Sequence, residues 1–135
     1  MAEAKISDIG HQYKALNGNL QIRSEEYIDK GCLLAFTYDY PDQPAEVSID
    51  TDEFTALCPW TGLPDYGTLK ITYTPSNKII ELKSLRYYLL SFRDVGIVQE
   101  HAANRVLEDL VDLCNPITIK ISLDYKIRGG MHTEV

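Results

Sequence analysis

The sequence predicts an α+β protein in which an antiparallel sheet carries two helices on one face. Several short segments alternate apolar and polar residues, as half-buried strands do, and a helical period replaces this pattern between residues 85 and 114. The order of strands, two helices and a final strand, with tight turns between strands, favours antiparallel pairing. A chain of 135 residues with 44% hydrophobic and 24% charged residues is typical of one globular domain.

The first half of the chain holds a tail, two expected strands and a long loop. Residues 1–20 are polar and predict a tail or arm, which leaves residues 21–135 for a single domain. Apolar and aromatic residues in GCLLAFTYDY predict a strand within 31–40, and the alternation in AEVSID predicts another at 45–50. Two prolines and two glycines in 52–67 predict a structured loop.

A hairpin is expected next. Leu69, Ile71 and Tyr73 alternate within residues 68–74, so this segment predicts a strand with these three side chains directed inward. The turn signal PSNK follows, and residues 79–82 are interpreted as the return strand of the hairpin.

Two helices and a last strand complete the predicted domain. The first helix follows from apolar residues at the spacing i, i+3, i+4 and i+7: Leu85, Tyr88, Leu89 and Phe92. A second helix is expected from about Ile97 to Cys114, with an apolar stripe along it and an Asn-Pro pair after it. Residues 117–125 alternate again and predict a strand, and RGG at 128–130 predicts a turn or bulge.

The predicted sheet has edges that find no partner strand within the chain. Exposed sheet edges are a liability that oligomers relieve by pairing strands between subunits. The sequence therefore predicts a homo-oligomer.

Acidic residues outnumber basic ones, but unevenly. The net charge is −7, made up of −8 in residues 1–66 and +1 in residues 67–135. Nucleic acid is therefore not expected as the main partner, because affinity for it depends on a basic surface. An anionic cofactor should bind to the second half. Alternatively, the net acidity serves only solubility.

The three cysteines, Cys32, Cys58 and Cys114, indicate a reduced protein. Their number is odd, their spacing matches no zinc motif, and no secretory signal is recognised. No apolar run is long enough for a membrane span, so no membrane partner is expected. These observations predict a cytoplasmic location. Cys32 and Cys114 lie in apolar settings typical of packed thiols.

Cys58 has a different setting from the other two cysteines. It precedes Asp65 by seven residues in a segment rich in proline and glycine, CPWTGLPDYG. Such a rigid, sharply bent segment is able to place a thiol and a carboxylate on one side of a cleft. That arrangement suits a covalent nucleophile beside a proton donor. The alternative is a buried loop thiol with Asp65 as an ordinary turn residue.

A second group of polar residues surrounds the start of the first helix. Glu81 ends the expected return strand, and Lys83 and Arg86 lie three apart on one helical face. These two cations and nearby backbone N–H groups are able to grip a phosphate. Glu100, near the start of the second helix, is able to accept hydrogen bonds from a guanine-like edge. The alternatives are a solvated helix start and an acid favoured by the helix dipole.

Several common site motifs are missing from the sequence. No G-x-G-x-x-G, Walker loop or G-x-S-x-G is found, so neither a Rossmann nor a P-loop nucleotide site is supported. His11, His101 and His132 show no metal-ligand spacing, and no metal is expected.

Four stretches of the chain carry a specific family pattern. They are FTALCPWTGLPDYG (54–67), IIELKSLRYYLLSFRD (79–94), the glutamate of VQEH (98–101) and IRGG (127–130). Together they resemble the NADPH-dependent 7-cyano-7-deazaguanine reductases of queuosine biosynthesis, the nitrile reductases known as QueF. The resemblance covers about residues 30–130 and is closest in length to the short, single-module branch.

The resemblance implies the tunnelling fold (T-fold), in which subunits join their antiparallel sheets into a β-barrel with active sites at subunit interfaces. It also implies that NADPH reduces the nitrile of 7-cyano-7-deazaguanine to a primary amine. By resemblance, Cys58 forms a thioimide with the nitrile carbon and Asp65 protonates the nitrile nitrogen. A thiolate adduct gives a C=N bond that a hydride is able to attack, and the hydride comes from the cofactor.

The family's ligand contacts carry over by position. The resemblance places five residues at the deazaguanine: Ile80, Glu81, Leu82, Gln99 and Glu100. It places five at NADPH: Leu82, Lys83, Arg86, Arg128 and Gly129. Gln99 stands where the family usually has histidine, and Arg86 stands where it usually has lysine, which keeps the charge but not the geometry.

Two other functions remain open at this point. One is a related enzyme that keeps the Cys-Asp pair but forms an amidine on a cyano-deazaguanine held in tRNA, which should lack the cofactor signature and carry a basic face. The other is a non-catalytic deazapurine-binding module. A zinc-dependent cyclohydrolase of the same fold would need differently placed histidines.

Overall fold

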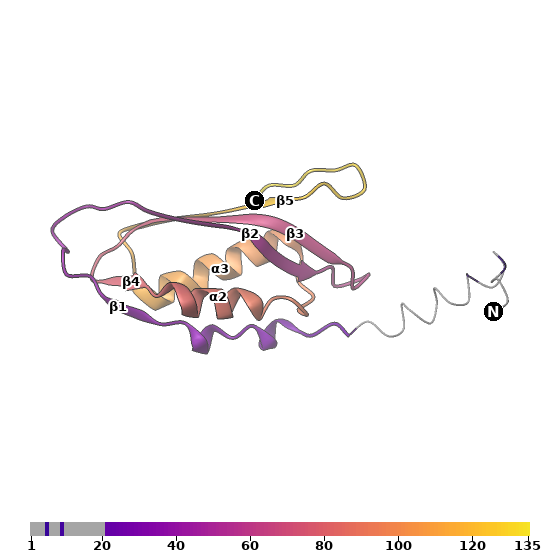
Figure 1. Cartoon of the computed structure of the whole chain (residues 1–135), viewed down its shortest axis with the longest axis horizontal. Helices are drawn as coiled ribbons and strands as arrows, with labels where there is room; N and C mark the ends of the chain where they lie inside the picture. Colours follow the sequence, from indigo (N-terminus) through magenta and orange to yellow (C-terminus); the bar gives the residue numbers. More distant parts are fainter. Residues whose placement is uncertain (1–4, 6–8, 10–20) are drawn as a thin grey trace.

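The computed structural model describes Lys5, Ile9 and residues 21–135, and the expected tail at 1–20 otherwise lies outside the described residues (Figure 1). The described elements, in chain order, are η1 (Glu25–Tyr27), η2 (Lys30–Cys32), β1 (Ala35–Thr37), β2 (Val47–Leu57), β3 (Pro64–Thr74), β4 (Lys78–Ile80), α2 (Leu82–Leu90), α3 (Gln99–Cys114) and β5 (Thr118–Tyr125). The class is α+β, with antiparallel pairing throughout both sheets, as the sequence predicts.

The main sheet has three strands in the order β2-β3-β5, and both helices lie beneath it (Figure 1). Leu57 pairs with Pro64 at one end of the β2–β3 ladder, and Val47 pairs with Tyr73 at the other. After β5 the chain turns back, and Val135 exchanges hydrogen bonds of 2.8 and 2.9 Å with Leu123. The last residues therefore extend the sheet beyond β5.

The prediction of a long loop at residues 52–67 is wrong at both ends. Strand β2 continues to Leu57 and β3 already begins at Pro64, so only residues 58–63 connect them. The register shifts between Thr51 and Phe54, as at a β-bulge, and this irregularity hides the period of the longer strand. Beyond it, burial of Phe54 provides the apolar contact that continues the strand.

The expected hairpin between residues 68–74 and 79–82 is also wrong. Strand β4 pairs with β1, with Ala35 opposite Ile80, and the two form a separate two-stranded sheet. The reason is that both edges of β3 are already occupied, by β2 and by β5. One hydrogen bond still joins the segments: the Ile80 N–H donates to the Tyr73 hydroxyl at 3.0 Å.

Both helices are confirmed, with slightly different ends. Helix α2 ends at Leu90, so Phe92 packs from the turn beyond it rather than from the helix. Helix α3 begins at Gln99, two residues later than expected, and ends at Cys114. Asn115 follows in the left-handed conformation, with φ 42°, which stops the helix.

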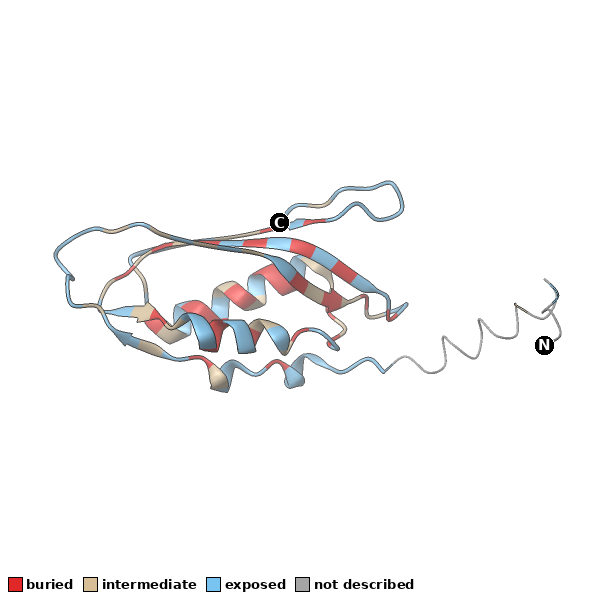
Figure 2. Cartoon of the chain, viewed as in Figure 1, coloured by how far each residue is buried: buried red, intermediate tan, exposed pale blue. Residues whose placement is uncertain are grey.

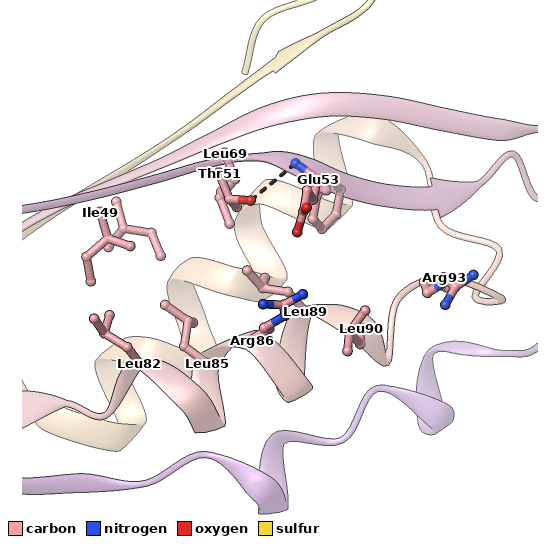
Figure 3. A pocket seen from close by; sticks show the side chains of 12 residues that line it. Ile49, Thr51, Glu53, Leu69, Leu82, Leu85, Arg86, Leu89, Leu90 and Arg93 are labelled. Carbon is pink, nitrogen blue, oxygen red and sulfur yellow. Dashed lines mark hydrogen bonds between the residues drawn. The ribbon is translucent and has the colours of Figure 1, made fainter.

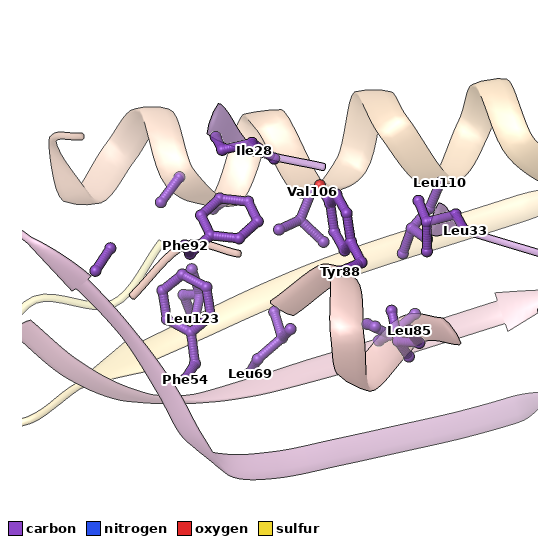
Figure 4. Close-up of a cluster of buried hydrophobic side chains, with 14 of the residues drawn as sticks. Ile28, Leu33, Phe54, Leu69, Leu85, Tyr88, Phe92, Val106, Leu110 and Leu123 are labelled. Atoms are coloured by element: carbon purple, nitrogen blue, oxygen red, sulfur yellow. The ribbon is translucent and has the colours of Figure 1, made fainter. Parts of the chain in front are cut away.

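The hydrophobic core lies between the main sheet and the two helices (Figure 4). The predicted inward side chains Leu69, Ile71 and Tyr73 are 0%, 1% and 2% exposed. Figure 2 shows buried and exposed residues alternating along β3, because its other face points away from the helices. In the core, Tyr88 of α2 donates to Asp109 of α3 at 2.7 Å and so joins the two helices.

Candidate active site

The loop between β2 and β3 holds the Cys58 thiol at one end of the sheet. The Cys58 N–H donates to the Leu63 carbonyl at 2.9 Å, and the Gly62 N–H donates to the Cys58 carbonyl at 2.9 Å. Gly62 has φ 71°, a left-handed conformation that glycine adopts without strain. This tight closure leaves the Cys58 residue only 5% exposed. The loop therefore holds Cys58 at the end of β2.

Asp65 lies beside this loop, on the strand that follows it. It is the second residue of β3 and pairs with Ala56, two residues before Cys58, in the β2–β3 ladder. The Thr55 hydroxyl donates to the Asp65 carbonyl at 2.8 Å, which holds this end of the ladder together. The aspartate is 7% exposed, so the structure places a buried carboxylate next to the thiol loop.

Arg128 reaches Asp65 from the C-terminal turn and forms an ion pair with its carboxylate. The Arg128 N–H and the Met131 N–H each donate to the other residue's carbonyl at 3.0 Å. Between them, Gly129 and Gly130 have φ values of 59° and 77°. A two-residue hairpin turn with positive φ at both central positions needs residues such as glycine, which explains the sequence RGG.

The surroundings of Cys58 favour its thiolate. Hydrogen bonding from the Thr61 side chain is the largest cause that lowers the pKa of the Cys58 thiol, to about 7. Backbone groups of Thr61 and Trp60 and the Arg128 side chain add to this lowering, while burial opposes it. An ordinary cysteine titrates near ~8.5. Cys58 is therefore able to act as a nucleophile at neutral pH.

The start of α3 meets the same end of the sheet. Leu57 exchanges two hydrogen bonds with the segment 95–97. The Leu57 N–H donates to the Val95 carbonyl at 2.9 Å, and the Ile97 N–H donates to the Leu57 carbonyl at 3.0 Å. The Tyr125 hydroxyl donates to the Gln99 carbonyl at 3.1 Å. Burial, followed by the Asp65 and Glu100 carboxylates, raises the pKa of Tyr125. Gln99 and Glu100 thus adjoin the Cys58–Asp65 pair.

The residues predicted around the start of α2 form a second group. The Glu81 carboxylate caps this helix, accepting from the Lys83 N–H at 3.0 Å and the Ser84 N–H at 2.6 Å. These hydrogen bonds lower the pKa of Glu81. Because the cap already uses these N–H groups, they do not offer the phosphate site that the sequence predicts there. The Lys83 and Arg86 side chains remain exposed.

A groove of about 250 Å³ lies between α2 and β2 (Figure 3). Leu82 and Arg86 line it, whereas Lys83 does not. Figure 3 shows Arg86 projecting from α2 toward the strand that carries Thr51 and Glu53. Most of the lining is aliphatic, and the remaining groups include two arginines and one glutamate. The groove combines an apolar wall with cationic side chains at the second group.

The two groups of predicted residues lie at opposite ends of the chain's fold. Asp65 lies near the start of β3. Ile80, which belongs to the second group, lies near the end of that strand, because its N–H donates to the Tyr73 hydroxyl. Eight residues separate Asp65 from Tyr73, which is about 26 Å at the usual rise of a strand. One small molecule does not bridge Cys58 and Glu81 of the same chain.

Sequence reasoning missed three residues that shape the catalytic end. Thr61 and Tyr125 were not singled out, although Thr61 lies in the Cys58 loop and Tyr125 lies in the segment before RGG. The third is Gly96, where a Cβ would lie 3.2 Å from the Pro59 Cα. A small residue at Gly96 therefore lets the Cys58 loop pack against the segment before α3.

A buried thiol with a lowered pKa beside a carboxylate, on an α+β scaffold, is the arrangement that a cysteine nucleophile needs. The family model described as QueF-like protein matches residues 64–135. A protein named NADPH-dependent 7-cyano-7-deazaguanine reductase from Thermoanaerobacter pseudethanolicus is 51% identical over 110 residues, covering 82% of this chain and 83% of that protein. One of the same name from Prochlorococcus marinus is 41% identical, covering 82% of each chain.

The chain belongs to the QueF family. Among solved structures, the apo archaeosine synthase QueF-Like matches with a TM-score of 0.64, covering 69% of this chain and 91% of that one. Its sequence identity is 22%, so this likeness concerns the fold alone. Within the described residues, none of the helices combines the length and apolar character needed to cross a bilayer.

Proposed function

We propose that this protein is an NADPH-dependent oxidoreductase that reduces 7-cyano-7-deazaguanine to 7-aminomethyl-7-deazaguanine, a step of queuosine biosynthesis. The observation that carries the proposal is the buried Cys58 thiol, with its pKa near 7, beside the Asp65 carboxylate. Relatives that are 40–51% identical over most of the chain carry the name of this reductase. The three cysteines are free thiols, which supports a reducing compartment such as the cytoplasm.

The Cys58–Asp65 pair begins the reaction in this proposal. The Cys58 sulfur adds to the nitrile carbon, and the C≡N bond becomes the C=N bond of a thioimide. Asp65 takes the thiol proton and passes it to the nitrile nitrogen, so the addition needs no outside proton. Gln99 has no titratable proton, so we assign this transfer to Asp65 and not to Gln99. The burial of both groups keeps water away from the adduct.

NADPH supplies the hydrides when bound, two per nitrile; of two further protons, one completes the amine and the other restores the Cys58 thiol. The described residues fit an anionic dinucleotide, because Lys83 and Arg86 are exposed cations on α2 and Arg86 borders an aliphatic groove. We assign this group, with Leu82, to the cofactor. Arg128 and Gly129 belong to the other end of the chain, where the RGG turn meets the Cys58 site.

The separation of the two groups supports an active site shared between subunits. Gln99 and Glu100 adjoin Cys58, whereas Ile80, Glu81 and Leu82 lie about 20 Å or more away along β3. We propose that a neighbouring subunit brings its Glu81 region to the Cys58 end of this chain. Glu100 then reads the guanine-like edge of the base that Cys58 attacks.

The sheet supports the same assembly. We assign residues 21–135 to one tunnelling-fold domain whose subunits join their sheets into a β-barrel. Within the described part of the chain, the outer edge of β2 pairs with no other strand, and this edge is 11 residues long. The face of β3 that points away from the helices is exposed and carries Thr68 and Lys70, so it suits a wet barrel interior.

The first test follows NADPH absorbance with the purified protein and 7-cyano-7-deazaguanine. The proposal predicts two NADPH oxidised per nitrile and, without NADPH, a mass increase located on Cys58. Cys58→Ala should abolish both, and Cys114→Ala is the matched control. An adduct on Cys58 without NADPH oxidation would instead favour the amidine-forming enzyme. Binding without an adduct would favour a deazapurine-binding module.

A further inference from the structure

The C-terminal turn gives Arg128 a role at the reacting groups themselves. The guanidinium pairs with the Asp65 carboxylate, and Arg128 also lowers the pKa of the Cys58 thiol. Asp65 is 7% exposed on its side chain, whereas the Arg128 side chain is 49% exposed. The arginine therefore enters the site from outside, contacts the Asp65 side chain directly and acts on the Cys58 thiol of the neighbouring loop.

We infer that Arg128 is a positioning residue of the Cys58–Asp65 pair, which bridges the two side chains and stabilises the anionic sulfur before any ligand binds. This inference rests on the proposed function for its catalytic meaning. It assigns Arg128 a contact within the free enzyme, in addition to the cofactor contact that the family resemblance implies.

The hairpin that carries Arg128 is well anchored. Its two strands are joined by the Leu123–Val135 hydrogen bonds and by the Tyr125 N–H, which donates to the Thr133 carbonyl at 3.0 Å. The Lys126 N–H donates to the Tyr66 carbonyl at 2.8 Å, next to Asp65. The guanidinium is thus delivered by a turn whose position is fixed on both sides, by β5 and by β3.

The charged groups at this end come from several elements. The Asp65 carboxylate of β3 and the Glu100 carboxylate of α3 both raise the pKa of Tyr125, a residue of β5. Arg128 pairs with Asp65 and also favours the Cys58 thiolate. The carboxylate and the thiol in turn raise the pKa of Arg128, so it stays charged. Removing Arg128 leaves Asp65 without its ion-pair partner and takes away a group that favours the thiolate.

The turn itself supplies an independent way to move Arg128. A Cβ on Gly130 would meet no atom within 4 Å, so a substitution there acts through its φ of 77° and not through a clash. Asparagine tolerates a positive φ, whereas valine does not. Gly130→Val should therefore displace the guanidinium, and Gly130→Asn should leave it in place.

The test measures the alkylation rate of Cys58 by iodoacetamide between about pH 5.5 and 9.5, because the thiolate is the form that reacts. The free enzyme is used, without NADPH or nitrile, and the modified peptide is quantified by mass spectrometry. In the wild type the rate should rise with a midpoint near pH 7, following the pKa of Cys58. Arg128→Gln should move the midpoint upward and slow alkylation at pH 7 by about two- to fivefold.

Matched variants separate a specific contact from a general effect. Lys126→Gln removes one positive charge from the same hairpin, and its ammonium lies 5.9 Å from the Tyr66 ring centroid rather than at the thiol. This variant should keep the wild-type midpoint, and Arg128→Lys should restore part of the shift. If Arg128→Gln does not fold, the Gly130 pair gives the same comparison.

Two results would overturn the inference: an unchanged midpoint in Arg128→Gln, or equal shifts in Arg128→Gln and Lys126→Gln. Because the alkylation assay uses neither nitrile nor NADPH, it tests the role of Arg128 even if the protein proves not to be a reductase. Conversely, an active reductase with an unshifted Arg128→Gln midpoint would retain the function and remove this role.

Discussion

The two ends of the domain differ in how completely one chain builds them. At the Cys58 end, a guanidinium pairs with a buried carboxylate and also lowers the pKa of a buried thiol. At the Glu81 end, the side chains of Leu82, Lys83 and Arg86 are exposed beside a groove. The comparison teaches that one chain holds the Cys58 group in a fixed arrangement, whereas it leaves the Glu81 end open, as the proposed contact with a neighbouring subunit requires.

The same contrast has a structural cause. Strand β3 is 11 residues long and spans the domain, so residues at its two ends are held apart. The Cys58 end is closed by the β2–β3 loop, the start of α3 and the C-terminal turn. At the other end, β4 joins the short strand β1 rather than the main sheet, which leaves the start of α2 at the surface.

Asp65→Asn should produce the largest effect, because it removes the proton carrier and the partner of Arg128. Loss of a general acid or base costs about 10²- to 10⁴-fold in rate. We expect a fall of that size in kcat, measured by NADPH oxidation. Asp124→Asn is the matched control, since Asp124 also pairs with a basic side chain, His132, but lies away from Cys58. Equal losses in both variants would contradict the special position of Asp65.

The alkylation rates of the three cysteines test the activation of the Cys58 end, with a smaller expected effect. Burial raises the pKa of Cys32 and Cys114, whereas hydrogen bonds lower that of Cys58 to about 7. At pH 7, Cys58 is about half thiolate and an ordinary thiol only a few per cent, so Cys58 should be alkylated at least about tenfold faster. Peptide mapping after brief iodoacetamide treatment measures this ratio. Faster labelling of Cys32 would show that the catalytic end is not activated.

Substitutions in the core between the two ends should lower the free energy of unfolding more than they change the reaction rate. Asp109 accepts hydrogen bonds from Tyr88 at 2.7 Å and from Arg105 at 2.8 Å, and it joins α2 to α3. Asp109→Ala leaves the buried Tyr88 hydroxyl unpaired, which should cost about 1–3 kcal/mol in urea unfolding. Asp112 is also on α3, but it forms an exposed ion pair with Lys30 of η2. Asp112→Ala should therefore change the free energy of unfolding by less than about 1 kcal/mol. Similar losses in both variants would refute the role of the buried contact.

Much of this architecture follows from periodicity and short-range signals. The alternation of Leu69, Ile71 and Tyr73 correctly predicts the buried face of β3, and Asn115 marks the end of α3. The partner of β4 was mispredicted, because adjacency in sequence favours a hairpin and only the competition for the edges of β3 excludes it. Pairing of this kind depends on the whole sheet, which no local pattern contains.

The candidate site shows the same division. The spacing of Cys58 and Asp65 leaves a nucleophile and a structural thiol both open, the family resemblance favours the nucleophile, and the structure places both residues at one end of the sheet. The contact of Arg128 with this pair was not foreseen, since 63 residues separate it from Asp65. Thr61 was also missed, because nothing in its sequence position reveals that its side chain binds the sulfur.

The most direct test of the shared site mixes inactive variants. Cys58→Ala and Glu81→Ala alter opposite ends, so co-refolded subunits should regain about a quarter of the wild-type rate if each site takes one end from each neighbour. Cys58→Ala mixed with Asp65→Asn alters the same end and should regain none. NADPH oxidation by the two mixtures decides the matter. Recovery in the first mixture alone is the predicted result; no recovery there, or equal recovery in both, would contradict an active site built between subunits.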